Sequence, residues 1–164
     1  MQIVGHYLQK EANRLGRRSP DFELFARSSF NRYYYAVYLH VRCVLSGLDK
    51  TWAKQSHKGI PDLLGGQVLE RIRRNKKQAN KIHDSELAKR CEHALAAARG
   101  LADMMKKAYL VRVTADYYPD VAVEPDDLGG FRLNSIRAHD ASEWLDKAKE
   151  YCSAIEQAAR LTDG

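Results

Sequence analysis

Between Leu87 and Tyr109 the chain reads LAKRCEHALAAARGLADMMKKAY, and this stretch decides the class of fold. Apolar residues recur in it at intervals of three and four, as they do on one face of an α-helix. The stripe consists of Leu87, Cys91, Ala94, Leu95, Ala98, Leu101, Ala102, Met105, Ala108 and Tyr109. Asp84-Ser85-Glu86, just before it, supplies the capping side chain and the acid typical of a helix start. The pattern predicts one long helix that buries this stripe in a helical core.

The same spacing predicts two helices on the N-terminal side. The first is expected from Ile3 to about Leu15, and its apolar residues are Ile3, Val4, Tyr7, Leu8, Ala12 and Leu15. The second is expected to begin at Ser19-Pro20-Asp21, a favourable helix start, and to run to about Ser46, where Gly47 suits a C-cap.

Two more helices complete the prediction. One is expected from Ile60 to about Asn75, with a kink or late start at Gly65-Gly66. The last is expected to start between Asn134 and Asp140, and its buried face would hold Ile136, Trp144, Leu145, Ala148, Cys152 and Ile155. Since no strand-like alternation exceeds Asp120-Val121-Ala122-Val123, the expected fold is all-α. It is an up-and-down bundle of about five helices in one domain, residues 1–164.

The composition is typical of a globular protein, and it bears on the cellular location and on the kind of partner. The 164 residues are 45% hydrophobic and 29% charged, so a core without disulfides or metals is expected. Cys43, Cys91 and Cys152 are odd in number and lie in apolar stripes, so they are expected to be reduced core residues. No membrane span or signal peptide is predicted, and the expected location is the cytoplasm. The net charge of +6 favours a nucleic-acid partner.

One predicted connection is unusually long. It runs from about Val113 to Leu133, whereas bundle connections usually take about two to eight residues. Its apolar side chains indicate that it packs back on the bundle. Chemistry, where present, is expected in this connection and at its two helix junctions.

Three segments resemble the HEPN superfamily of small helical bundles. The Tyr-rich run from Asn31 to His40 is similar to the family's aromatic-Tyr-Ala-Val/Phe helix, which carries a histidine. Arg112-Val113-Thr114-Ala115-Asp116-Tyr117 is similar to the Arg-x-x-Ala-Asp-Tyr segment found before the last helix. Ser56-His57-Lys58-Gly59 resembles a Ser-His-x-Gly turn that opens a middle helix. The resemblance implies the same kind of fold over nearly the whole chain.

The resemblance also implies a candidate catalytic pair. Many HEPN proteins are metal-independent endoribonucleases with an Arg, four to six residues and a His ahead of the last helix, and a dimer brings two copies together. Arg132 and His139 fit this spacing. A guanidinium can hold a phosphate, and an imidazole can transfer the proton of a hydroxyl. The chain departs from the family in the residue after Arg132 and in having Ala141 where a Tyr is usual. The alternative is a surface basic cluster at a helix N-terminus.

Arg132 and His139 can act on one phosphate only in a particular arrangement of the chain. On one regular helix, Arg132 and His139 would lie two turns apart, roughly 10 Å along the axis. They could share one phosphate only if Arg132 lies in the connection and the chain folds back.

Other motif residues have both functional and structural interpretations. Arg112, Asp116 and Tyr117 match a family variant that often occurs in partners of small nucleotidyltransferases. The structural alternative is an Arg112–Asp116 pair four residues apart with packed tyrosines. His40 is expected to be a core or interface histidine with its hydrogen bonds satisfied, and His57 a helix cap or a neighbour of His40. Neither a metal nor a cofactor is expected.

A dense basic run lies at the end of the third predicted helix, within residues 71–81. Its cations are Arg71, Arg73, Arg74, Lys76, Lys77 and Lys81, with no acid among them. Such a run is either a solvated helix end or a patch that contacts a phosphate backbone.

Two functional hypotheses follow. The first is an RNA-associated protein of toxin–antitoxin or defence type, which acts as a homodimer and cleaves RNA through Arg132 and His139. The second is a non-catalytic module that dimerises and docks a nucleotidyltransferase, an antitoxin of that type or a nuclease through residues 113–133. In both, the Tyr-rich helix and the last helix are expected to supply the apolar dimer surface.

Overall fold

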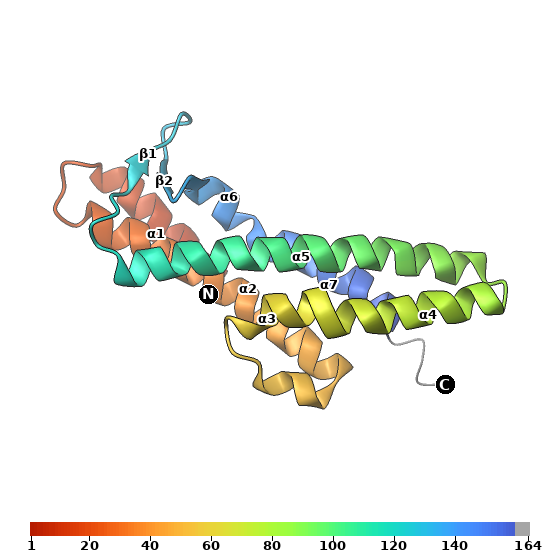
Figure 1. The fold of residues 1–164 in the computed structure, drawn as a ribbon. Coiled ribbons are helices and arrows are strands. Elements are labelled where there is room, and N and C mark those ends of the chain that lie inside the picture. The colour runs from red at the N-terminus through yellow and green to blue at the C-terminus, as the bar shows by residue number, and fades with distance from the viewer. Residues whose placement is uncertain (160–164) are drawn as a thin grey trace. The chain divides into compact units, whose positions relative to one another are not determined.

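The computed structural model describes residues 1–159 and has helices in nearly every part of that range (Figure 1). This confirms the predicted all-α helical bundle. The chain forms two compact units. Unit 1 comprises residues 1–38 and 107–145, and unit 2 comprises residues 39–106 and the chain from residue 146 onward. Helices α2, α5 and α7 contribute residues to both units, so each unit is described separately below.

Unit 1 begins with α1 (Gln2–Leu15), which ends at Gly16 with a positive φ of 69°. Helix α2 (Phe22–Leu48) follows a turn in which the Ser19 hydroxyl accepts a hydrogen bond from the Asp21 amide, 3.3 Å away. The two helices approach closely at Gly5, where a Cβ atom would lie 2.7 Å from the Tyr33 ring. The contact between α1 and α2 therefore depends on the absence of a side chain at this position.

The burial of α1 differs from the prediction. Its buried residues are the small ones, Gly5 and Ala12, whereas Ile3, Val4 and Tyr7 are exposed. The helix approaches its neighbour through backbone and small side chains, so Ile3, Val4 and Tyr7 face away, while Leu8 and Leu15 are half-buried.

The predicted long connection after Val113 begins later than expected and contains a small sheet. It remains long, residues 118–137 between α5 and α6, and it packs back as predicted, because Val123, Phe131 and Leu133 are buried. Helix α5 (Ser85–Tyr117) continues four residues past Val113, and a small antiparallel sheet follows. Its strands are β1 (Glu124–Pro125), β2 (Phe131–Leu133) and β3 (Ile136–Arg137). Strands of two or three residues are too short for an alternating pattern to reveal them.

A two-residue turn joins β2 to β3. Asn134 and Ser135 both have positive φ, 50° and 63°, the conformation of a type I′ hairpin turn. In this register Arg132 lies opposite Arg137. The hairpin also presents Phe131 to the core, where its ring contacts Phe22 and Phe30 edge-on with centroids 5.8 Å apart in each case.

After β3 the chain enters α6 (Ala138–Ser142) and then α7 (Trp144–Ala159). Helix α6 begins within the expected range, Asn134 to Asp140, but α7, which carries the predicted buried face, begins later, at Trp144. Trp144, Ala148, Cys152 and Ile155 are buried as predicted. Ile136, expected on the buried face of this helix, belongs to β3 instead and is half-buried.

In unit 2, α2 runs two residues past its predicted end. The Asp49 amide donates to the Leu45 carbonyl at 3.0 Å, so Gly47 lies inside the helix and is not its C-cap. The Asp49 side chain then accepts from the Thr51 amide at 2.8 Å and caps the short 3-10 helix η1 (Lys50–Lys54). An aspartate, a favourable N-cap residue, thus marks the true boundary.

The third predicted helix is interrupted where the glycines suggested. Helix α3 (Gly59–Leu63) passes into a π-helical turn, η2 (Leu64–Val68), and then into α4 (Leu69–Lys81). Gly65 and Gly66 lie in the π-helical turn, as is common for local widenings of a helix. Helix α4 runs six residues beyond the predicted end at Asn75.

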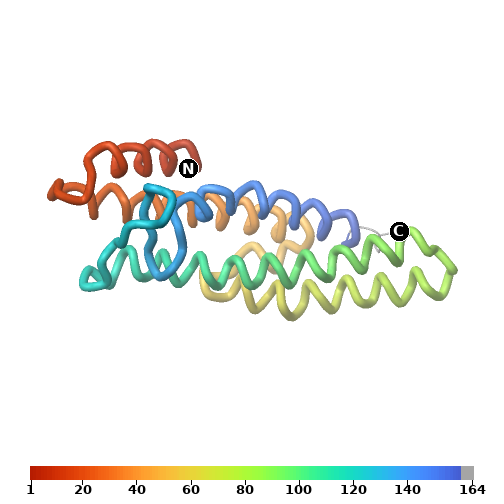
Figure 2. Tube along the Cα trace, turned by 90° about the horizontal axis from the view of Figure 1, so that it is seen from above, coloured from red at the N-terminus to blue at the C-terminus, as the bar shows by residue number. Residues whose placement is uncertain are grey.

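Helix α4 and the first part of α5 lie side by side and antiparallel in unit 2 (Figures 1 and 2). Asp84 caps α5 by accepting the Leu87 amide at 2.9 Å, as the sequence predicted. Cys91 and Cys152 are buried, and burial raises the pKa of the Cys152 thiol to about 12. Cys43, expected in the core, is exposed.

Phe131 tests the hairpin's contribution to the core. Phe131→Ala is expected to lower the free energy of unfolding by about 3–5 kcal/mol, because it removes a buried ring and its two aromatic contacts. Urea denaturation measures this change. Leu128→Ala, at a residue that is 71% exposed on the same segment, serves as the control and is expected to change stability little. Equal effects of the two substitutions would contradict the proposed packing.

Candidate functional site

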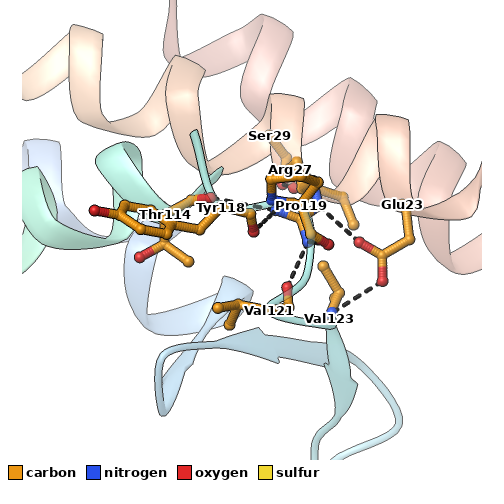
Figure 3. Close-up of polar contacts among 9 residues, drawn as sticks. Glu23, Arg27, Ser29, Thr114, Tyr118, Pro119, Val121 and Val123 are labelled. Carbon is orange, nitrogen blue, oxygen red and sulfur yellow. Dashed lines mark hydrogen bonds and ion pairs between the residues drawn. The ribbon is translucent and has the colours of Figure 1, made fainter. Parts of the chain in front are cut away.

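Arg27 forms hydrogen bonds with the end of α5 and with the chain that follows it. Figure 3 shows the Arg27 side chain of α2 among backbone carbonyls of residues 114–121. Its guanidinium donates to Thr114 at 3.3 Å, to Tyr118 at 3.2 Å, to Pro119 at 3.2 Å and to Val121. Two of these carbonyls belong to the last turn of the helix or just follow it. The Thr114 and Tyr118 carbonyls also accept from the Tyr118 and Val121 amides, at 3.1 and 3.2 Å. Arg27 therefore adds a charge-assisted hydrogen bond to each of them, at the negative end of the helix dipole.

Glu23 completes this contact one turn earlier on α2. One carboxylate oxygen accepts from Arg27 Nε at 2.7 Å, and the other accepts from the Val123 amide at 2.9 Å (Figure 3). We call Glu23 and Arg27 together the α5 clamp. Sequence reasoning missed it, because an i,i+4 Glu–Arg pair is common on exposed helices. Its low exposure, 13% for the Arg27 side chain, becomes visible only in the fold.

A second polar cluster lies nearby in unit 1 and contains the predicted motif residues. Arg112 Nη2 lies 2.8 Å from the Asp116 carboxylate. The guanidinium also lies 5.3 Å from the Tyr117 ring centroid and 6.0 Å from that of Tyr35. Asn31 donates to the second Asp116 oxygen. The sequence therefore predicted the Arg112–Asp116 pair correctly, but not the roles of Asn31 and Tyr35.

Electrostatics keep Arg112 charged in this cluster. Burial by itself would lower the pKa of its guanidinium, but the Asp116 charge and a hydrogen bond with Tyr117 hold that pKa above its ordinary value. Its Nε is buried and has no partner in the described chain, and neither does the Asn31 carbonyl oxygen. Most polar groups of the cluster are satisfied within it, which is the pattern of a structural network.

The predicted pair Arg132 and His139 lies on the hairpin and on the helix after it. Because the chain reverses at Asn134 and Ser135, the two residues do not share one helix. Cross-strand neighbours project from the same face of a sheet, so Arg132 and Arg137 lie beside each other. The condition that the chain folds back after Arg132 is therefore met.

Each cation of this region has an acidic neighbour. Arg132 lies 3.0 Å from Glu124, Arg137 lies 3.0 Å from Asp140, and His139 Nε2 lies 3.6 Å from Glu143. Exposed pairs of this kind contribute roughly 0–1 kcal/mol, so an incoming phosphate could displace the acids. His139 is 63% exposed and borders a cleft of about 250 Å³ that Gln9, Asn13 and the 126–130 turn also line. Arg132 is not among the residues that line this cleft.

His40 and His57 belong to unit 2, whereas the Arg112 cluster belongs to unit 1. His40 is half-buried, and its Nε2 is buried without a hydrogen-bond partner in the described chain. The expectation of a fully satisfied histidine was therefore wrong. Burial and then the charge of Lys149 lower the pKa of His40, partly offset by Glu156. His57 lies in the turn before α3, where the Ser56 hydroxyl accepts from the Gly59 amide at 3.1 Å.

The basic run on α4 divides into fixed and free cations. Arg71 donates to the carbonyls of Leu48 and Ala159 at 3.0 and 3.2 Å, and Lys76 contacts Glu92 of α5. Arg71 and Lys76 therefore have structural roles. Although residues 71–81 contain no acid, Glu92 from the next helix lies beside Lys76. The remaining cations are exposed and have no partner among residues 1–159: Arg73, Arg74, Lys77 and Lys81. We call these four the α4 basic face.

Comparison with protein-family models, with curated proteins and with solved structures gives no match to this chain. The HEPN resemblance therefore rests on the three sequence motifs alone. Among residues 1–159, no helix is both long and apolar enough to cross a membrane, and no cluster of three His, Cys, Asp or Glu side chains could hold a metal ion.

The α5 clamp predicts a clear mutational effect. Arg27→Ala is expected to lower the free energy of unfolding by about 2–3 kcal/mol, since it removes charge-assisted hydrogen bonds to several carbonyls. Arg27→Lys is expected to recover less than half of this loss, because an ammonium group lacks the planar fork of five donors. Chemical denaturation measures both, and amide exchange at Val123 is expected to accelerate.

Arg14→Ala provides the matched control, because it breaks an exposed Glu–Arg pair on α1. It is expected to leave stability and the Val123 exchange rate almost unchanged. Unchanged exchange at Val123 in Arg27→Ala would show that the clamp does not order this segment.

Proposed function

We propose that this chain is an RNA-binding protein that contacts the phosphate backbone through the α4 basic face. The observation that carries the proposal is the set of four exposed cations without acidic partners among the described residues. Residues 73, 77 and 81 recur every four positions and so share one side of the helix. A row of this kind matches the spacing of charges along a nucleic-acid backbone, and binding releases condensed counterions.

The HEPN resemblance supports a more specific setting. It favours a cytoplasmic protein of toxin–antitoxin or defence type that acts as a homodimer. The dimer surface needs a different location from the one predicted, because Tyr33, Tyr34 and Tyr38 of the Tyr-rich helix are buried within the chain. Exposed Ile3, Val4 and Tyr7 of α1 offer an apolar alternative.

RNA cleavage without metal is the catalytic extension of this proposal. The β2–β3 hairpin supports it by placing Arg132 beside Arg137, two residues before the exposed His139. Two guanidinium groups could neutralise the charge that a phosphodiester gains in the transition state. The imidazole would then transfer the proton of the attacking 2′-hydroxyl or of the leaving oxygen.

A non-catalytic docking role is the second candidate. Tyr117 and Tyr118, at the end of α5, are 65% and 56% exposed, and Leu110 and Leu128 are exposed as well. Exposed tyrosines are enriched at protein interfaces. They support the hypothesis that a nucleotidyltransferase or nuclease partner binds this part of unit 1.

The RNA-binding proposal is tested by removing charge from α4. The triple variant Arg73→Gln, Lys77→Gln and Lys81→Gln is expected to weaken binding to single-stranded RNA. Each phosphate contact contributes about −0.7 to the slope of log K against log salt, so the slope is expected to become less negative by about 2. Fluorescence anisotropy at several salt concentrations measures both quantities.

The matched control removes the same charge from scattered exposed positions: Lys10→Gln, Lys54→Gln and Lys107→Gln. It is expected to retain most of the affinity and the slope. If both triple variants lose affinity equally, net charge and not the α4 basic face governs binding. If the wild-type protein does not bind RNA, the proposal fails.

The catalytic extension has its own test. Wild-type protein in EDTA is expected to cleave RNA, and His139→Ala is expected to lower the rate by about 10²-fold or more, because it removes the proton-transfer group. His93→Ala, at another exposed histidine, serves as the control and is expected to keep the activity. No cleavage by the wild type, or equal cleavage by all three proteins, would leave Arg132 and His139 without a catalytic role.

A further inference from the structure

Unit 2 contains a cleft of about 400 Å³ next to the α4 basic face. Its lining residues come from η1 with its N-cap, from η2 and from α4, all within one unit: Asp49, Trp52, Gln67, Glu70, Arg71, Arg74 and Asn75. The volume lies within the usual range for small-molecule sites, roughly 300–1,000 Å³. Arg74 belongs both to this cleft and to the α4 basic face.

Several of the lining groups are held in place by contacts within the protein. The Trp52 indole N–H donates to Gln67 Oε1 at 3.0 Å, and Arg71 is fixed by the two carbonyls already described. Asp49 accepts from the Thr51 amide and hydroxyl, and these hydrogen bonds hold the pKa of its carboxyl below the ordinary value. The cleft therefore has rigid walls, which reduces the entropy lost on binding.

Other lining groups have unused hydrogen-bonding capacity. Glu70 and Arg74 are exposed at the cleft, and neither has an ion pair or side-chain hydrogen bond with any residue in the range 1–159. Asn75 is only 2% exposed, and its Nδ2 donates to the Ala158 carbonyl at 2.7 Å. Its Oδ1 is buried without a partner in the described chain.

The free Glu70 carboxylate and the free Arg74 guanidinium together favour a ligand that has both donors and acceptors. Guanine presents adjacent N–H donors at N1 and N2, which match the two oxygens of one carboxylate, and acceptors at O6 and N7 that suit arginine. The other three RNA bases do not present two adjacent donor nitrogens on the Watson–Crick edge. We propose that this cleft binds an unpaired guanine nucleotide, with Glu70 accepting from the base and Arg74 donating to the base or its phosphate.

The inference rests on the proposed RNA function and adds a base preference to it. Single-stranded RNA is commonly recognised by unstacked bases that enter pockets and bond through their edges. The α4 basic face would hold the backbone on either side of such a base, and Arg74 would connect the two surfaces. A mononucleotide tests the cleft separately from the extended backbone contact.

The experiment titrates GMP, IMP, AMP, CMP and UMP into the full-length chain by calorimetry. A parallel fluorescence titration uses Trp144→Phe, which leaves Trp52 in the cleft as the reporter. GMP is expected to bind saturably and at least about tenfold more tightly than AMP, CMP or UMP. IMP, which lacks the N2 amine, is expected to bind about tenfold more weakly than GMP, since one of the two donors is missing.

Variants identify the group that reads the base. Glu70→Gln is expected to weaken GMP by about tenfold and to reduce the preference over IMP, because an amide offers one acceptor in place of two. Glu150→Gln removes the same charge from an exposed position of α7 and is expected to have no effect. Equal affinity for all five nucleotides, no GMP binding, or an unchanged GMP affinity in Glu70→Gln would each overturn the proposal.

The outcomes separate the two proposals. RNA binding that depends on the α4 basic face, without any preference for GMP, would overturn the guanine site alone. Selective GMP binding without RNA binding would support the cleft and overturn the RNA function.

Discussion

The structure of unit 1 depends on the hydrogen bonds of one guanidinium. Arg27 reaches the carbonyls around the end of α5, and Glu23 holds both Arg27 and the Val123 amide. Thr114 and Tyr118 also have backbone donors, but no other donor to the Pro119 and Val121 carbonyls is found in the described residues. The clamp thereby sets where the chain leaves α5. The small sheet, the Phe131 contact with the core and the placement of Arg132 all come after that point.

The Arg112 cluster has a complementary role at the same helix end. It joins the α2 residues Asn31 and Tyr35 to Asp116 and Tyr117 through an ion pair, a hydrogen bond and two ring contacts. Such a network favours one arrangement of the two helices, because Asn31 and Tyr35 of α2 contact Asp116 and Arg112 of α5 only when the helices lie in this register. The motif that resembles the HEPN family thus has a structural role that requires no reaction. The residues proposed for chemistry lie further along the chain, on the hairpin and α6.

Charge in this protein is divided between neutralised and free groups. On the hairpin and α6, Arg132, Arg137 and His139 each have a carboxylate beside them. On α4, four cations have no such neighbour in the described range, and one of them borders a cleft with an unpaired carboxylate. Under the proposed RNA function, the α4 basic face would contact the polyanion. A reaction at the hairpin would additionally require its acids to be displaced.

The sequence by itself determined the helical class, most helix starts and the Arg112–Asp116 pair, because periodicity, capping residues and i,i+4 spacing act over a few residues. It also located the interruption at Gly65 and Gly66. The α5 clamp, the small sheet and the cleft in unit 2 could be recognised only from the tertiary structure. Glu23 and Val123 lie 100 residues apart, and strands of two or three residues exist only through their partners. Burial of α1 likewise depended on a close approach at Gly5, which no local pattern encodes.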